Sequence, residues 1–297
     1  MPKELVVVQQ KKGCFMGGPY TCNITYSEND ITYHVSILQL CTRIITISTE
    51  TIVELTQLRS IYYSLITYLL LFDGYFCSVA TVTEDDVEIT NDFIRNEPAC
   101  YQSADFMLIY KDVTLHFSDY LSSKSLSRWV NLKEILDISF TAVLYSLSSV
   151  QMPIDMKCAY LIEAFKPLAE LTKKEVPDFV LQNESTLKPC LLAIINRYGQ
   201  DIFSKEIETD RDSFLTVLVS SRNRMAHIKS GQNEKVLNGE ECSIYLRKLS
   251  RLYRVTIFNL LGISQSVYQS NMQKQVDLIN AEKNLETFLS RLAKAKV

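Results

Sequence analysis

The stretch 212–227, DSFLTVLVSSRNRMAH, decides the fold of the second half of this 297-residue chain. Its apolar residues recur at helical spacing, so it predicts a helix whose cap is Asp210 or Asp212. The last turns of this helix carry Arg222, Asn223, Arg224 and His227 within six residues. His227 is one of only three histidines in the chain, and the other two, His34 and His116, are interpreted as packed or surface side chains.

This cluster combines the groups that phosphate chemistry needs. Arginine binds phosphate through paired hydrogen bonds and stays charged, while histidine gains or loses a proton near neutral pH. Asn223 and His227 lie four residues apart and share a helix face, so Asn223 is expected to orient the His227 ring. Arg222 and His227 lie five residues apart, about 140° around the helix, and flank a groove. The two residues can act on one ligand if the long arginine side chain bridges that angle or if the site is shared with a second subunit.

Helical periodicity continues on both sides of this stretch. From about residue 126 onward it predicts helices over 130–147, 155–171, 189–198 and 240–261, separated by Pro153, Pro177, Pro189 and Gly199. A final helix is expected over 264–296; its polarity makes it a poor core helix and suggests that it projects for dimerisation or docking.

The first half has a different pattern. Residues 5–8, 20–26, 31–40, 42–47, 76–82 and 106–117 read as strands, and Glu84-Asp85-Asp86 as a solvated turn. The apolar residues of 53–71 predict one helix, in which Tyr62, Tyr63 and Tyr68 are interpreted as core residues. The sequence therefore predicts an α+β chain: a β-rich module over 1–125 and an all-α helical bundle over 126–297.

Charge is unevenly distributed along the chain. The net charge is −3, but residues 1–130 sum to −6 and residues 131–297 to +3. The window 220–254 holds eight basic and three acidic residues. Within it, Arg247, Lys248, Arg251 and Arg254 recur at three and four residues, so they share one helix face, which is either solvated or lines an RNA groove. A polyanionic partner is expected to bind the second half.

Other function classes are not supported. The eight cysteines show no zinc-ligand spacing, so no metal site is predicted, and free thiols in a reducing cytoplasm are expected. The longest apolar run, residues 61–72, is shorter than the ~20 residues that span a membrane, so no membrane association is expected. No phosphate-binding glycine loop or hydrolase nucleophile motif occurs.

The run Arg222-Asn223-Arg224-Met225-Ala226-His227 resembles the R-x4–6-H signature of the HEPN superfamily in its RN-x-x-AH form. The resemblance covers about residues 126–262, and the LIEAF stretch with Glu163 is similar to the acidic and apolar helix of these bundles. It implies a metal-independent endoribonuclease without a cofactor, in which the RNA 2′-OH attacks the adjacent phosphate and leaves a 2′,3′-cyclic phosphate and a 5′-OH. It assigns general acid or base catalysis to His227, charge stabilisation to Arg222, and positioning to Asn223.

Arg224 and the basic face at 247–254 are the expected RNA contacts. The resemblance also implies a homodimer with two motifs in one cleft. The β-rich first half followed by a HEPN-like bundle is similar in layout to bacterial ApeA-type anti-phage proteins, which implies a defence or toxin-like role. In that layout residues 1–125 bind a trigger or an inhibitor.

Two alternatives stay open. The motif residues are a solvated helix end in one of them, with His227 near the negative end of the helix dipole. In the other the bundle is a non-catalytic scaffold that binds RNA or a protein.

Overall fold

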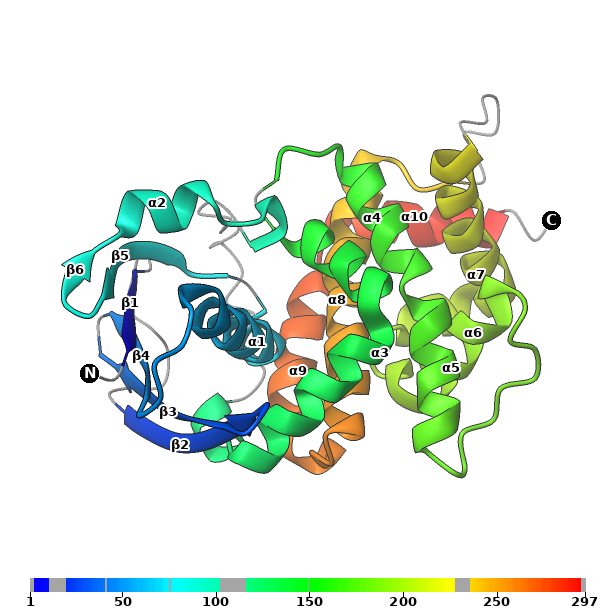
Figure 1. Cartoon of the computed structure of the whole chain (residues 1–297). Helices are drawn as coiled ribbons and strands as arrows, with labels where there is room; N and C mark the ends of the chain where they lie inside the picture. Colours follow the sequence, from blue (N-terminus) through cyan, green and yellow to red (C-terminus); the bar gives the residue numbers. More distant parts are fainter. Residues whose placement is uncertain are drawn as a thin grey trace. The chain divides into compact units, whose positions relative to one another are not determined.

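The computed structural model describes residues 3–10, 20–40, 42–74, 76–101, 116–148, 150–227 and 236–294. Two compact units divide the chain: residues 1–134 with 148–150, and residues 135–147 with 151–297. The division falls nine residues after the predicted boundary at 125/126. An antiparallel sheet occupies the first unit and helices the second (Figure 1), which confirms the α+β fold class.

The sheet of the first unit has the order β2-β3-β4-β1-β5-β6 among the described residues, and every neighbouring pair is antiparallel. Its strands are β1 (Glu4–Gln10), β2 (Tyr20–Glu28), β3 (Ile31–Gln39), β4 (Arg43–Thr49), β5 (Ser78–Glu84) and β6 (Val87–Glu88). Two-residue turns join β2 to β3 and β5 to β6, with positive φ at both central residues, namely Asn29, Asp30, Asp85 and Asp86. Asn and Asp tolerate this conformation, which suits the twist of a tight hairpin.

Helix α1 (Leu55–Asp73) packs on this sheet. Gln9 Nε2 donates to Tyr62 Oη at 3.2 Å, and Arg43 forms a buried ion pair with Asp73 at 2.8 Å. Gly74 ends the helix with φ 77°, and its N–H donates to Leu70 O. The apolar run at 61–72 is therefore buried core of α1, and no helix among the described residues is long and apolar enough to cross a membrane.

Short helices complete the first unit. They are α2 (Thr90–Arg95), η1 (Ala99–Tyr101) and η3 (Phe117–Asp119), followed by the start of α3 (Ser123–Leu147). Glu84-Asp85-Asp86 forms the predicted turn. The strand predicted at 106–117 falls almost entirely outside the described residues, and Phe117 begins η3 instead.

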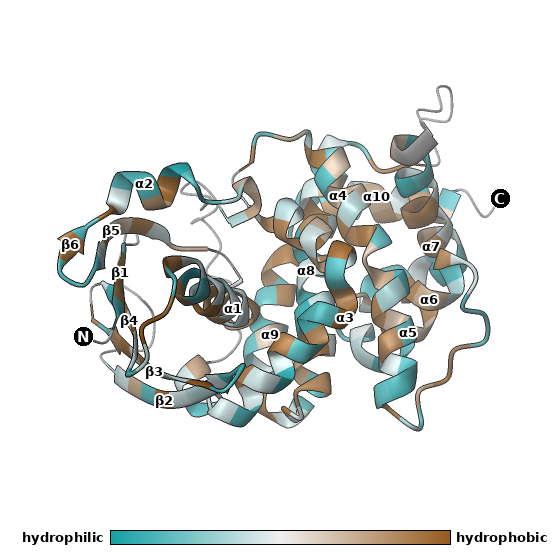
Figure 2. Ribbon diagram, in the orientation of Figure 1, coloured by the Kyte–Doolittle hydropathy of each residue, from teal (hydrophilic) through white to brown (hydrophobic). Residues whose placement is uncertain are grey.

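The second unit is built around one central helix. Its elements are the end of α3, α4 (Ile154–Glu163), α5 (Phe165–Glu175), α6 (Leu187–Ile194), the π-helical turn η4 (Ile195–Gly199), α7 (Ser204–His227), α8 (Gly239–Leu260), α9 (Gln265–Asn280) and α10 (Lys283–Lys294). Helix α8 packs against α4, α5, α9, α10 and η4, and side-chain contacts also join it to α7. Figure 2 shows hydrophilic and hydrophobic residues interleaved on these helices, as expected for helices with one buried side.

The expectation of a projecting final helix is wrong. The segment forms α9 and α10, and both pack on α8 while α10 also packs on α7. Tyr268, Met272 and Val276 of α9 and Phe288 of α10 are buried. Few apolar residues suffice here because they fall on one side of each helix, so a low overall hydropathy does not exclude a core role.

Candidate functional site

Helix α7 positions the predicted motif. Its backbone departs from helical geometry at Asp210, and Asp210 Oδ1 then accepts a hydrogen bond from Ser213 N at 3.0 Å, which caps the following turns as predicted. Phe214, Leu215 and Leu218 are buried and fix the rotation of this helix. The motif therefore lies on the last two turns of a helix that is held along its apolar side.

Ser221 anchors the end of α7. Its hydroxyl donates to Val217 O at 2.7 Å and accepts from Leu237 N at 2.8 Å, and the side chain is buried. Leu237 lies just before α8, where Asn238 caps the helix through Glu241 N. The two ends of segment 228–235, which is outside the described residues, are thus tied together beside the motif.

Arg222 is held by two polar neighbours. Its Nε donates to Glu163 Oε2 at the end of α4, and one of its terminal nitrogens donates to Asn223 Oδ1 at 3.0 Å. The side chain of Arg222 is 26% exposed and that of Glu163 is 45% exposed, so the pair is at the surface of the unit. The arginine is oriented but still reachable by a ligand.

Arg222 has N–H donors that no described residue uses. A guanidinium has five N–H donors, and the two hydrogen bonds to Glu163 and Asn223 use two of them. The other three, on the terminal nitrogens, form no hydrogen bond with the described residues. Three donors in one plane match two oxygens of a phosphate, so the anchored side chain still has a binding edge.

Asn223 contacts Arg222 through its side chain. Its Oδ1 accepts a hydrogen bond from the guanidinium, and its predicted role of orienting His227 stays a prediction. The backbone of α7 reaches His227, but the side chain of that residue is outside the described part of the structure, so its orientation stays a prediction. Arg224 is exposed on the same turn.

The basic face of α8 does not lie on the surface. Lys248, Arg251 and Arg254 are 0%, 3% and 1% exposed, and the side chain of Arg247 is 12% exposed. Their expected role as RNA contacts is therefore corrected: the structure places all four cations against other helices of the same unit. The periodicity at 247–254 does define one helix face, but protein covers that face.

Carboxylates and amides from distant elements pair with three of these cations, Arg247, Lys248 and Arg251. Lys248 Nζ forms an ion pair with Glu206 at 2.6 Å, and Tyr245 Oη donates to the same carboxylate. Arg247 makes a bidentate contact with Glu282 at 2.6 and 2.7 Å. Arg251 donates to Gln275 on α9. Burial lowers the pKa of Lys248, and the Glu206 carboxylate opposes that effect. These contacts hold α7, α9 and α10 on α8.

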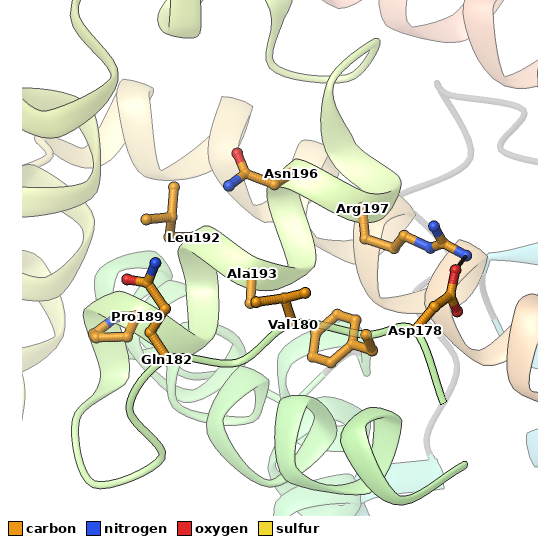
Figure 3. A pocket seen from close by; sticks show the side chains of 9 residues that line it. Asp178, Val180, Gln182, Pro189, Leu192, Ala193, Asn196 and Arg197 are labelled. Carbon is orange, nitrogen blue, oxygen red and sulfur yellow. Dashed lines mark ion pairs between the residues drawn. The ribbon is translucent and has the colours of Figure 1, made fainter. Parts of the chain in front are cut away.

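A small recess lies elsewhere in the helical unit. Figure 3 shows Asp178, Val180 and Gln182 opposite Pro189, Ala193 and Arg197 across a cavity of about 230 Å³. Arg197 and Asp178 close one end with an ion pair of 3.0 Å. None of the motif residues lines it, so the recess and the Arg222 cluster are separate features.

Sequence reasoning missed the partner of Arg222. Glu163 was expected only as part of a helix, because 59 residues separate it from Arg222 and no local signal links them. The Ser221 clamp also depends on a contact across 16 residues. No group of three or more His, Cys, Asp or Glu side chains is placed to hold a metal ion among the described residues.

Comparison with known proteins agrees with the motif. Residues 154–267 match the model of the family described as Apea-like HEPN, and this range contains Glu163, Arg222 and His227. No curated protein and no solved structure matches the chain. The chain therefore contains a HEPN domain of the ApeA type in its helical C-terminal part.

Proposed function

We propose that this protein is an endoribonuclease of the HEPN type that cuts RNA without a metal ion. The HEPN domain itself suggests a nuclease or defence-type role. The observation that supports this proposal is the state of Arg222, which is anchored by Glu163 and Asn223 yet has three N–H donors that no described residue uses. An arginine at a solvated helix end has no need of two such anchors.

The proposed reaction needs one base, one acid and one positive group. The 2′-OH of the RNA loses its proton to a base and attacks the adjacent phosphorus, and the departing 5′ oxygen takes a proton from an acid. His227 serves as base or acid. Arg222 stabilises the extra negative charge of the pentacoordinate intermediate. Asn223 fixes the guanidinium plane, and exposed Arg224 contacts the RNA backbone.

The biological role proposed here is that of a bacterial phage-defence or toxin-like effector that acts as a cytoplasmic homodimer. Two copies of the motif facing one cleft bring Arg222 of one subunit to His227 of its partner. They also bridge the angle of about 140° that separates Arg222 from His227 on one helix. The β-rich unit is proposed to receive the trigger or inhibitor.

The test is cleavage of a defined RNA in excess EDTA, with detection of the 2′,3′-cyclic phosphate end. Arg222→Ala and His227→Ala are expected to lower cleavage by at least about a hundredfold, since each removes a transition-state contact. Arg211→Gln is the matched control, because Arg211 is an exposed arginine on the same helix outside the motif. Undiminished cleavage by His227→Ala contradicts the assignment.

A non-catalytic scaffold is the second candidate, and one contact favours it. The Glu163 carboxylate neutralises part of the charge that Arg222 offers to RNA. A scaffold binds RNA or a protein through the exposed residues around Arg224, and the same assay then shows binding without any cleavage product.

A further inference from the structure

The first unit holds a cavity that the proposed nuclease does not use. Its volume is about 380 Å³, within the ~300–1,000 Å³ typical of small-molecule sites. It is lined by Thr56, Arg59, Ser60 and Tyr63 of α1, Tyr101 of η1 and Lys133 of α3. The four α1 residues are spaced by three, one and three positions, so they form one stripe of the helix.

Two cations line this cavity without a carboxylate among its walls. The Arg59 guanidinium lies 4.7 Å from the centre of the Phe93 ring, and its Nε is buried with no hydrogen-bond partner in the described part of the chain. No ion pair involves Arg59 there either. Lys133 Nζ donates to Ser64 Oγ at 3.0 Å, and burial lowers the pKa of this amine. Neither cation forms an ion pair with a described residue, although Glu134 and Glu28 act electrostatically on Lys133.

Hydroxyl and aromatic groups line the same space. The Tyr63 hydroxyl is buried and has no hydrogen-bond partner among the described residues, although buried hydroxyls nearly always have one. Its ring stacks on Tyr101 with centroids 4.4 Å apart. Tyr62 and Tyr68 of the same helix are core residues as expected, whereas Tyr63 is only half-buried and lines the cavity. The wall therefore offers a flat apolar surface beside unused donors.

One carboxyl group lies close enough to influence these rings. Glu97 acts electrostatically on Tyr63 and Tyr101, and burial raises its own pKa to about 7. Since a carboxyl with that pKa is about half protonated at neutral pH, it opposes an anion less than an ordinary glutamate does.

We propose that this cavity binds a nucleoside phosphate. Arg59 and Lys133 hold the phosphate, the hydroxyls of Thr56, Ser60 and Tyr63 complete its hydrogen bonds, and the Tyr63 and Tyr101 rings contact the base. The site is separate from the Arg222 cluster, and its occupation does not depend on whether the helical domain cuts RNA.

Calorimetric titration of the full chain tests this proposal. The probes are the four nucleoside 5′-monophosphates, the corresponding nucleosides, and inorganic phosphate. At least one monophosphate is expected to bind at least about tenfold more tightly than its nucleoside or phosphate alone, because it makes both kinds of contact. Absence of binding by all four monophosphates overturns the proposal, and equal binding of inorganic phosphate overturns the nucleoside part of it.

Variants locate the binding. Arg59→Gln and Tyr63→Phe are each expected to weaken the monophosphate by about tenfold, the loss typical of a hydrogen bond to a charged group. Tyr63→Phe keeps the ring and removes a hydroxyl that has no partner among the described residues, so it tests the site even if Arg59→Gln unfolds. Arg95→Gln is the matched control because Arg95 is exposed on α2. Unchanged affinity in Arg59→Gln and Tyr63→Phe overturns the location.

Discussion

At the scale of single residues, the contact between Arg222 and Glu163 joins the motif to helix α4. Exposed ion pairs contribute at most about 1 kcal/mol to stability, so this one has little structural value by itself. Its effect is on the arginine, which is held in one orientation by a carboxylate from α4 and an amide from its own helix. We therefore treat Glu163 as a positioning residue for the proposed reaction.

Glu163→Gln tests that role. The amide keeps the shape and one acceptor oxygen but removes the charge, so the protein is expected to stay folded while RNA cleavage falls by about tenfold. Glu184→Gln is the matched control, since Glu184 forms a similarly exposed ion pair with Lys173 in the same unit. The measurements are cleavage rate and melting temperature. A loss of melting temperature without a loss of rate contradicts the positioning role.

Glu97 is expected to make the stability of the first unit depend on pH. Burial raises its pKa from 4.5 to about 7, so the folded protein holds a proton that the unfolded chain has already released. The free energy of unfolding therefore falls as pH rises from about 4.5 to 7 and changes no further above that range. Glu97→Gln removes this loss, so the variant is expected to melt higher than the parent at pH 8 and equally at pH 4.

Melting temperatures between pH 4 and 8 check the expectation. Asp92→Asn is the control because Asp92 is an exposed carboxylate on the neighbouring helix. A constant difference between Glu97→Gln and the parent at every pH contradicts the assignment to Glu97.

At the scale of elements, local pattern predicts most helices and strands, but not what covers them. The periodicity of 240–261 predicts α8 within a residue at each end, and β2, β3 and α1 also follow their patterns closely. Spacing shows that Arg247, Lys248, Arg251 and Arg254 share a face. It cannot show that Glu206, Gln275 and Glu282 cover that face, because those partners come from 24 to 42 residues away.

Packing between distant segments also explains the other differences between the predicted and observed structure. Residues 155–171 form two helices, α4 and α5, that meet at Ala164, where the apolar pattern continues without a break signal. The motif itself is readable because it is local. Glu163, the Ser221 clamp and the cavity of the first unit are not, since each depends on packing between distant segments.

Lys248→Met tests the structural role of the α8 cations. It leaves Glu206 buried without its counter-charge, although Tyr245 still donates to it, and such a loss typically costs about 3–5 kcal/mol of unfolding free energy. The double variant Lys248→Met with Glu206→Gln is expected to recover much of that loss, and Lys174→Met, at an exposed lysine, to change little. Urea unfolding provides the measurement. If the Lys248→Met protein is as stable as the parent but binds RNA more weakly, Lys248 contacts RNA after all.

At the scale of the whole molecule, the net charge of −3 is the sum of an acidic first half and a basic second half. Part of the basic excess is internal, because Lys248, Arg251 and Arg254 are buried. Within the motif, the described cations that stay accessible are Arg222 and Arg224, so we expect RNA binding to depend on these residues rather than on the α8 face.

A mixed dimer tests whether the site is shared. Arg222→Ala and His227→Ala chains carry different tags, are co-expressed, and the species with both tags is isolated. If each site combines Arg222 of one subunit with His227 of its partner, one site of the mixed dimer is intact, and about half of the parent's cleavage remains. Each variant alone is inactive. An inactive mixed dimer means that Arg222 and His227 act within one chain.

The central place of α8 has a consequence for how the helical unit opens. Backbone amides exchange with solvent only when their hydrogen bonds break, and amides in the most enclosed element exchange last. Helix α8, packed by α4, α5, α9, α10 and η4, is expected to give the slowest-exchanging amides of this unit. The end of α7 is tied to the start of α8 through Ser221 and Leu237, so deuterium uptake there reports whether the motif opens alone or only with the core.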